Sequence, residues 1–243
     1  MKVDVGGKTL RTAETADGAI RKVEAFPFYG SGSGKLDGIL GGGYRAGTLT
    51  EIFGRSNSGK SQLAMQATVE AASLGHRVLY IDTEGSFRPE RLEQMSLARG
   101  RDASGILERV VCVRSDSAAE QMEAVRRMQS RATTASCRMV VVDTLTRNFS
   151  VDLPGASNIA SRQEAIDVHL SEMSRDAYLN SRAYILTNRV TFGPVHDVPI
   201  GGKTVEQLVS ASVRLERNGS GVTATREDSG RSVVLEMSGG GVL

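Results

Sequence analysis

The chain has 243 residues, of which 40% are hydrophobic and 24% charged, an ordinary balance for a globular protein. It holds no run of about 18 apolar residues, and its N-terminus lacks the apolar core of a secretory signal, so we expect neither a membrane protein nor a secreted one. The formal net charge of +2 permits a nucleic-acid partner without requiring one.

The first 47 residues show little periodic pattern. Residues 1–25 are polar and predict an arm or a frayed lead-in. Residues 30–47 are glycine-rich around one short apolar turn, which predicts a loop, one helical turn and a second loop. We therefore place an N-terminal arm at residues 1–27 and a single folded domain at residues 28–243.

From residue 48 onward, apolar runs alternate with amphipathic runs. The apolar runs predict strands at residues 48–53, 77–82, 109–113, 138–143 and 182–188. The amphipathic runs predict helices at residues 61–75, 88–100, 117–132 and 160–181. Three short strands, at 210–217, 221–228 and 232–237, predict a small antiparallel C-terminal extension. The fold class is therefore α/β, with a mostly parallel twisted sheet and helices on both faces.

Cysteine and histidine are sparse and show no spacing typical of metal ligands. Cys112 and Cys137 each adjoin an apolar run, which favours two reduced, buried thiols over a disulfide or a metal site. The three histidines are scattered along the chain, at positions 76, 169 and 196. We therefore expect no structural metal.

Two stretches run glycine and serine into a lysine: GSGSGKLDG at 30–38 and GRSNSGKSQ at 54–62. A phosphate-binding P-loop needs glycine, four residues and then Gly-Lys-Ser or Gly-Lys-Thr, placed between a strand and a helix. Only the second stretch fits. The first has Tyr29 where the glycine belongs and Leu36 after the lysine, so a flexible approach to a short helix is the better interpretation.

The P-loop predicts a nucleotide site. Its backbone N–H groups should hold phosphate oxygens at the positive end of the following helix. Lys60 should reach the β- and γ-phosphates, and the Ser61 hydroxyl should be a ligand for Mg²⁺. The residues expected to bind nucleotide here are Gly54, Arg55, Ser56, Asn57, Ser58, Gly59, Lys60, Ser61 and Gln62.

Acidic residues close two predicted buried strands. Asp143 ends the strand at 138–143, as expected of the carboxylate that holds the magnesium shell beside a P-loop. Asp82 and Glu84 follow the strand at 77–82, and carboxyl ends of parallel strands face one crevice. Glu84 could take a proton from the attacking water or orient it, or it could instead cap the next helix; spacing alone leaves both open.

Several segments follow one another in an order that resembles a known family: LDGILGGGYRAGTLTEIFGRSNSGKSQLAMQ, YIDTEGSFRPERL, MVVVDTLT, YILTNRV and PIGGKTVEQLVSASVRLER. From about residue 28 to 236 the chain resembles the ATPase core of archaeal and eukaryotic RecA-type recombinases. Within the archaeal RadA/RadB group, its shortness is most similar to the core-only paralog type, RadB. KaiC-type ATPases share only the more general parts.

The resemblance implies a RecA-like ATPase core at residues 28–243 and gives roles to its residues. Glu84 matches the family's catalytic glutamate, acting with Lys60. Arg91 matches an arginine that stacks on adenine; its alternative is a solvated helix charge. Asn188 and Arg189 fall where recombinases have Asn-Gln, whose Gln senses the γ-phosphate. An arginine there is a charged donor to phosphate but would not position water as an amide does.

The resemblance also places two DNA-binding loops, at about 147–161 and 190–203. The second loop is short and holds few basic residues, so we expect weak DNA binding. The residues expected to contact DNA are Arg147, Arg162, Phe192 and Lys203. The family's Phe-x-x-Ala subunit-linking motif is not visible in residues 1–27, and TREDSGRSVV stands where recombinases carry a proline-containing cap over the neighbour's ATP.

The expected function is therefore that of an ATP- and Mg²⁺-binding recombinase paralog that hydrolyses ATP slowly and assists homologous recombination and DNA repair. Its expected partners are DNA, single-stranded or other, the main recombinase or another repair protein, and further copies of itself. We expect it in the cytoplasm, associated with the nucleoid. The alternative is a KaiC-like nucleotide-switched interaction module without a direct DNA role, which the modest charge also permits.

Overall fold

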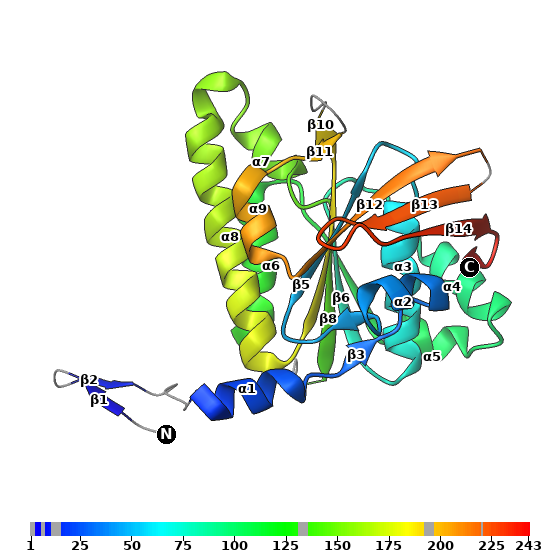
Figure 1. Ribbon diagram of the computed structural model, residues 1–243, viewed down its shortest axis with the longest axis horizontal. Helices are drawn as coiled ribbons and strands as arrows, with labels where there is room; N and C mark the ends of the chain where they lie inside the picture. The colour runs from blue at the N-terminus through cyan, green and yellow to red at the C-terminus, as the bar shows by residue number, and fades with distance from the viewer. Residues whose placement is uncertain (1–2, 6–7, 11–15, 131–135, 192–196, 220) are drawn as a thin grey trace.

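The structure is a computed structural model that describes residues 3–5, 8–10, 16–130, 136–191, 197–219 and 221–243 (Figure 1). Its centre is a nine-stranded sheet in the order β15-β14-β13-β12-β5-β9-β8-β6-β7. The strands predicted from apolar runs are present as β5 (Leu49–Gly54), β6 (Arg77–Asp82), β7 (Val110–Arg114), β8 (Cys137–Asp143) and β9 (Ala183–Asn188). These five pair in parallel, so the predicted α/β class with a mostly parallel sheet is confirmed.

The C-terminal strands extend this sheet on the β5 side. They are β12 (Ala211–Asn218), β13 (Gly221–Arg226), β14 (Ser232–Ser238) and β15 (Gly241–Val242). β12, β13 and β14 pair antiparallel in that order, as predicted. β12 also pairs parallel with β5, and β15, which was not predicted, pairs antiparallel with β14. β12 thus joins the two parts of one sheet and lies beside the strand that leads into the P-loop.

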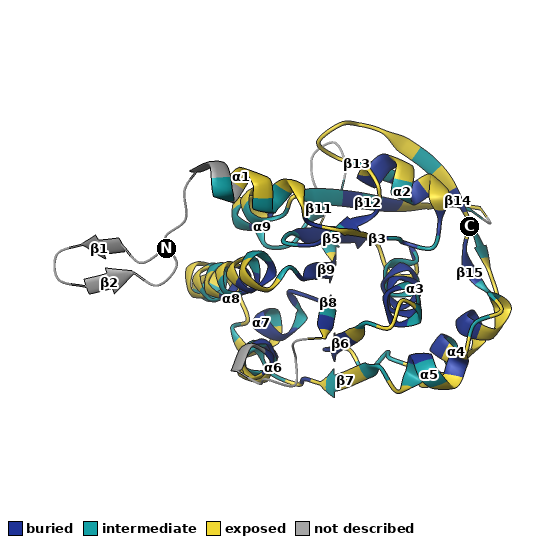
Figure 2. Cartoon of the chain, turned by 90° about the horizontal axis from the view of Figure 1, so that it is seen from below, coloured by how far each residue is buried: buried dark blue, intermediate teal, exposed yellow. Residues whose placement is uncertain are grey.

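Helices cover both faces of the sheet (Figure 2). One face carries α2 (Gly34–Leu40), α3 (Lys60–Ser73), α4 (Pro89–Ala98) and α5 (Ala103–Leu107). The other carries α6 (Ala118–Ser130), α7 (Arg147–Asp152), α8 (Ile159–Asn180) and α9 (Gly202–Leu208). Alternate residues of each central strand enter opposite cores: Val141 packs on the first face, and Val140 and Val142 on the second. This alternation explains why these strands are apolar throughout.

The N-terminal region is more ordered than its sequence predicts. Residues 16–24 form the helix α1 (Ala16–Glu24), so the expectation of a frayed lead-in is wrong for this segment. The Lys22 ammonium lies 4.2 Å from the centroid of the Tyr178 ring on α8, a cation–π contact that holds α1 to the domain. Before α1, β1 (Val3–Val5) pairs antiparallel with β2 (Lys8–Leu10).

Three short pieces complete the chain. β3 (Phe28–Tyr29) pairs with β4 (Tyr44–Arg45) in a separate two-stranded sheet. β10 (Val190–Thr191) pairs with β11 (Val198–Pro199), which brings the start of the predicted second DNA loop beside residues 198 and 199. A short 3₁₀ turn, η2, spans Ala156–Asn158. The predicted first loop at 147–161 is therefore largely helical, formed by α7, η2 and the start of α8.

The two cysteines differ in exposure. Cys137 on β8 is buried, as predicted, but Cys112 is exposed, so the prediction of a buried thiol is wrong there. Cys112 lies on β7, the edge strand of the sheet, where an apolar run does not guarantee cover on both faces. None of the helices in the described part of the chain combines the length and apolar character that crossing a membrane requires.

Candidate nucleotide-binding site

The P-loop connects β5 to α3, which is the strand–loop–helix placement that the motif requires. Gly59 caps α3 with a φ of 97°, a left-handed conformation that favours glycine. The Lys60 ammonium donates to the backbone carbonyls of Gly54 and Arg55, each at 2.8 Å. Burial lowers the pKa of Lys60, and the nearby charges of Asp143 and Glu84 oppose that shift. The Lys60 ammonium therefore binds carbonyls of its own loop, and the charges of both predicted acids, Asp143 and Glu84, act on it.

Asp143 closes β8 and is 2% exposed. The Tyr80 hydroxyl donates to its Oδ2 at 2.6 Å, and the Thr187 hydroxyl donates to its Oδ1. These bonds hold the carboxylate in one orientation. Together with the Ser61 hydroxyl in the first turn of α3, it offers the oxygen donors that Mg²⁺ prefers, so the residues present fit this metal.

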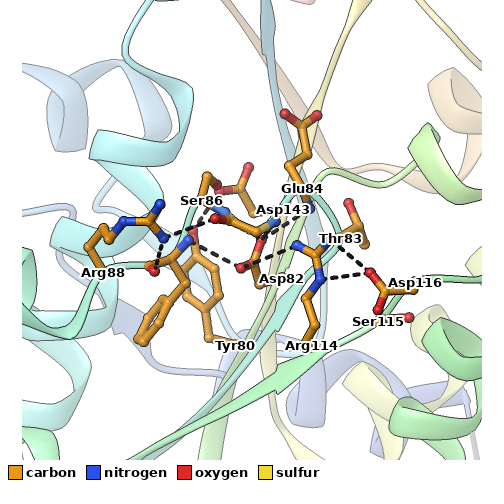
Figure 3. A network of polar contacts seen from close by, with 12 residues as sticks. Tyr80, Asp82, Thr83, Glu84, Ser86, Arg88, Arg114, Ser115, Asp116 and Asp143 are labelled. Carbon is orange, nitrogen blue, oxygen red and sulfur yellow. Dashed lines mark hydrogen bonds and ion pairs between the residues drawn. The ribbon is translucent and has the colours of Figure 1, made fainter.

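Asp82 has a structural role in the neighbouring turn (Figure 3). Its Oδ1 accepts the backbone N–H groups of Glu84, Gly85 and Ser86 at 2.8–3.2 Å, and its Oδ2 accepts that of Phe87 at 3.2 Å. A carboxylate with four such donors fixes the path of the chain after β6. The turn that carries Glu84 is thus preorganised by Asp82.

Glu84 does not cap α4. The capping position of that helix is Arg88, whose side chain makes no capping bond, so the capping alternative is wrong. In Figure 3 the Glu84 side chain points away from the Asp82 network. Its Oε1 accepts the Thr144 hydroxyl at 2.9 Å and the Arg189 guanidinium, from Nε at 2.9 Å and from Nη2 at 2.7 Å. The two residues expected to act on the γ-phosphate side therefore contact each other directly.

The segment after β9 also contacts the P-loop. The Arg55 guanidinium forms an ion pair with Asp197, with a second bond at 3.1 Å. A cleft of about 340 Å³ lies between these segments. The residues that line it are Gly54, Arg55, Ser56, Arg189, Val190, Thr191 and Asp197. This cleft borders the first residues of the P-loop, Gly54, Arg55 and Ser56.

Arg91 is half-buried at the side of the P-loop helix. Its Nε donates to the Gln62 side chain at 3.1 Å, and its Nη groups donate to the carbonyls of Ser238 and Gly239. The alternative of a solvated helix charge is therefore wrong. The Arg91 guanidinium lies between α3 and the C-terminal strands. Its contact with adenine remains a prediction.

Three of the four residues expected to contact DNA lie in the described part of the chain, one each on α7, α8 and α9. Arg147 bonds to the Asn148 side chain at 3.1 Å, and Arg162 donates to the carbonyl of Leu153 at 2.6 Å. Lys203 is exposed at the start of α9. Phe192 lies outside the described residues. The DNA-binding role of all four remains a prediction.

Residues 28–223 match the Rad51 family, which is most of the chain. The chain belongs to the Rad51 family. Among its curated relatives are proteins named "DNA repair and recombination protein RadA". That of Metallosphaera sedula is 32% identical over 89% of this chain and 68% of the relative, and that of Ignicoccus hospitalis is 33% identical over 83% and 63%. That of Aeropyrum pernix is 34% identical over 72% of this chain and 56% of its own length, so the Rad51-family chain spans little more than half of that relative.

Sequence reasoning missed several residues of this candidate site. Tyr80 and Thr187 orient Asp143, Thr144 contacts Glu84, and Asp197 contacts the P-loop. Hydroxyl residues inside apolar strands are common, so Tyr80 and Thr187 gave no signal by themselves. Asp197 pairs with a residue 142 positions away, which no local pattern reveals.

Proposed function

We propose that this Rad51-family chain binds ATP with Mg²⁺, hydrolyses it slowly, binds DNA weakly and assists homologous recombination and repair as a RadB-like paralog. One observation carries the proposal. Asp143 and Glu84 follow different strands from the one that leads into the P-loop, yet the charges of both acids act on the Lys60 ammonium of that loop. The names of the RadA relatives support the recombination and repair role.

The proposed mechanism uses residues already held in place. Lys60 leaves the carbonyls of Gly54 and Arg55 for the β- and γ-phosphates, which are stronger, charged acceptors. Ser61 and Asp143 hold Mg²⁺, which supplies neutralisation of phosphate charge. Glu84 accepts a proton from the attacking water or orients that water.

Slow hydrolysis follows from the contact between Glu84 and Arg189. Three donors reach the same Glu84 oxygen, one from Thr144 and two from Arg189, so hydrogen bonds already occupy that oxygen and an attacking water must compete for it. A γ-phosphate would compete with Glu84 for the guanidinium, because arginine binds phosphate strongly. Arg189 thus senses the nucleotide and restrains the base at the same time.

We expect Arg189→Gln to raise DNA-stimulated ATP turnover about 10-fold, since a neutral amide releases Glu84 and can orient water. The measurement is steady-state phosphate release with and without single-stranded DNA. Arg88→Gln is the matched control, because Arg88 is also an exposed arginine near Glu84 but bonds only to the carbonyls of Gly85 and Phe87 among the contacts described. Equal turnover by Arg189→Gln and the unaltered chain, with and without DNA, would refute the restraint.

The function itself is tested by following DNA binding and ATP turnover together. Fluorescence anisotropy of a labelled single-stranded oligonucleotide is measured with ATP, with ADP and without nucleotide, across a salt series. We expect ATP to strengthen binding. We also expect a log–log salt slope of about −2, since roughly three phosphate contacts to single-stranded DNA correspond to that slope. Tight ATP binding with no DNA response at any salt concentration would reject the DNA role and favour the nucleotide-switched interaction module.

A further inference from the structure

A buried carboxyl group lies directly behind the P-loop. Glu51 is on β5, three residues before Gly54, and is 1% exposed. Its Oε1 accepts the Asn188 side-chain N–H at 2.8 Å, and its Oε2 accepts the Ser212 hydroxyl at 2.7 Å. Burial raises the pKa of Glu51 above its usual range. A carboxyl group in such a place costs folding free energy unless its hydrogen bonds are made, so its partners matter.

The main partner of Glu51 is the amide of Asn188, and every hydrogen-bonding position of that amide is used. Its Nδ2 donates to Glu51 and to the carbonyl of Ile200, the latter at 2.6 Å. Its Oδ1 accepts the Thr146 hydroxyl at 2.7 Å and the backbone N–H of Arg189 at 2.9 Å. Two acceptors on one side and two donors on the other allow the amide only one orientation.

This amide joins three segments of the proposed nucleotide site. Thr146 follows Asp143 in the loop after β8, and Ile200 lies on the return of the segment that follows β9. The third segment is the backbone of Arg189, from which the guanidinium extends to Glu84. A change in the orientation of the Asn188 amide would therefore shift the point from which Arg189 reaches into the site.

We propose that Glu51 is a positioning residue for γ-phosphate recognition, which it supports by holding the Asn188 amide in the one orientation that places Arg189. The inference rests on the proposed ATP site and deepens it. It predicts that Glu51 affects the preference for ATP over ADP, since only ATP has the phosphate that Arg189 would contact. Contacts of the P-loop with the inner phosphates do not depend on it.

The neighbouring space makes substitution at Glu51 practicable. A cavity of about 520 Å³ lies against Glu51 and Phe53 on this face of the sheet, so a side chain of similar size can be accommodated. Glu51→Gln keeps an oxygen that can accept from Asn188 and gains an amide N–H that can donate to Ser212. Glu51→Leu removes both acceptors at nearly the same volume.

The test measures equilibrium affinities for ATP and ADP with Mg²⁺ by competition against a fluorescent nucleotide. We expect Glu51→Leu to lower the ratio of ATP to ADP affinity about 10-fold, with ADP affinity within about twofold of the unaltered chain. Glu51→Gln should keep both affinities within about twofold. Thr50→Val is the matched control, since Thr50 is a buried polar residue of the same strand that faces the other side of the sheet.

The outcomes separate this inference from the proposed function. If the unaltered chain binds no nucleotide, or does not prefer ATP to ADP, the proposed γ-phosphate site is wrong. If that preference exists and Glu51→Leu lowers both affinities equally or leaves the ratio unchanged, Glu51 is only structural and the inference is overturned. Should Glu51→Leu not fold, Thr146→Val withdraws a donor from the other side of the Asn188 amide, and an unchanged ratio in this variant would overturn the inference too.

Discussion

Lys60→Ala is expected to lower the affinity of the chain for ATP by about 100-fold or more. The substitution removes the ammonium that would bind the β- and γ-phosphates, and charge-assisted bonds of this kind are among the strongest polar contacts in proteins. The contacts that Lys60 loses go to the carbonyls of its own loop, Gly54 and Arg55, so the folded domain should persist. Isothermal titration with ATP and Mg²⁺ measures the effect, and a thermal melt confirms the fold.

Lys35→Ala is the control for this experiment. Lys35 ends the other glycine- and serine-rich stretch, is exposed, and lies in α2 without a P-loop pattern around it. ATP affinity should be unchanged in this variant. Unaltered binding by Lys60→Ala, or loss of binding in Lys35→Ala, would show that the P-loop at residues 54–61 has been assigned to the wrong stretch.

Glu84→Gln is expected to keep ATP bound while lowering its hydrolysis roughly 100- to 10,000-fold, the range typical of removing a general base. Glutamine retains an oxygen that can accept the Thr144 hydroxyl, so the turn preorganised by Asp82 should remain. Loss of the ion pair with Arg189 leaves that guanidinium available to a phosphate, which should support binding. Single-turnover hydrolysis and nucleotide affinity are measured on the same preparation.

Glu90→Gln provides the comparison for Glu84→Gln. Glu90 is an exposed acid in the first turn of α4, six residues further along the same segment. Its substitution should leave hydrolysis within about twofold of the unaltered chain. If turnover persists at a similar level in Glu84→Gln, the water must be activated by another group, and Asp143 would be the next residue to substitute.

Local patterns in the sequence determined much of this molecule. The central strands are buried on both faces, so their residues must be apolar throughout, and their positions follow from that. The P-loop is equally local, because glycine positions, lysine and serine act within eight consecutive residues. The same patterns were too weak to predict two helices. α5 (Ala103–Leu107) has only five residues. The polar sequence of α1 is stabilised by its contact with Tyr178, which no local pattern reveals.

The contacts that set the chemistry were decided only by the tertiary structure. Glu84 and Arg189 are 105 residues apart, and Glu51 and Asn188 are 137 apart. Sheet order brings them together: β9 lies between β5 and β8, and β6 lies next beyond β8, so side chains that follow distant strands meet at one edge. The exposure of Cys112 also depends on strand order, because a short apolar run does not indicate whether its strand is central or at an edge. Sequence determines which residues can form strands and loops, whereas the order of strands determines which of their side chains meet.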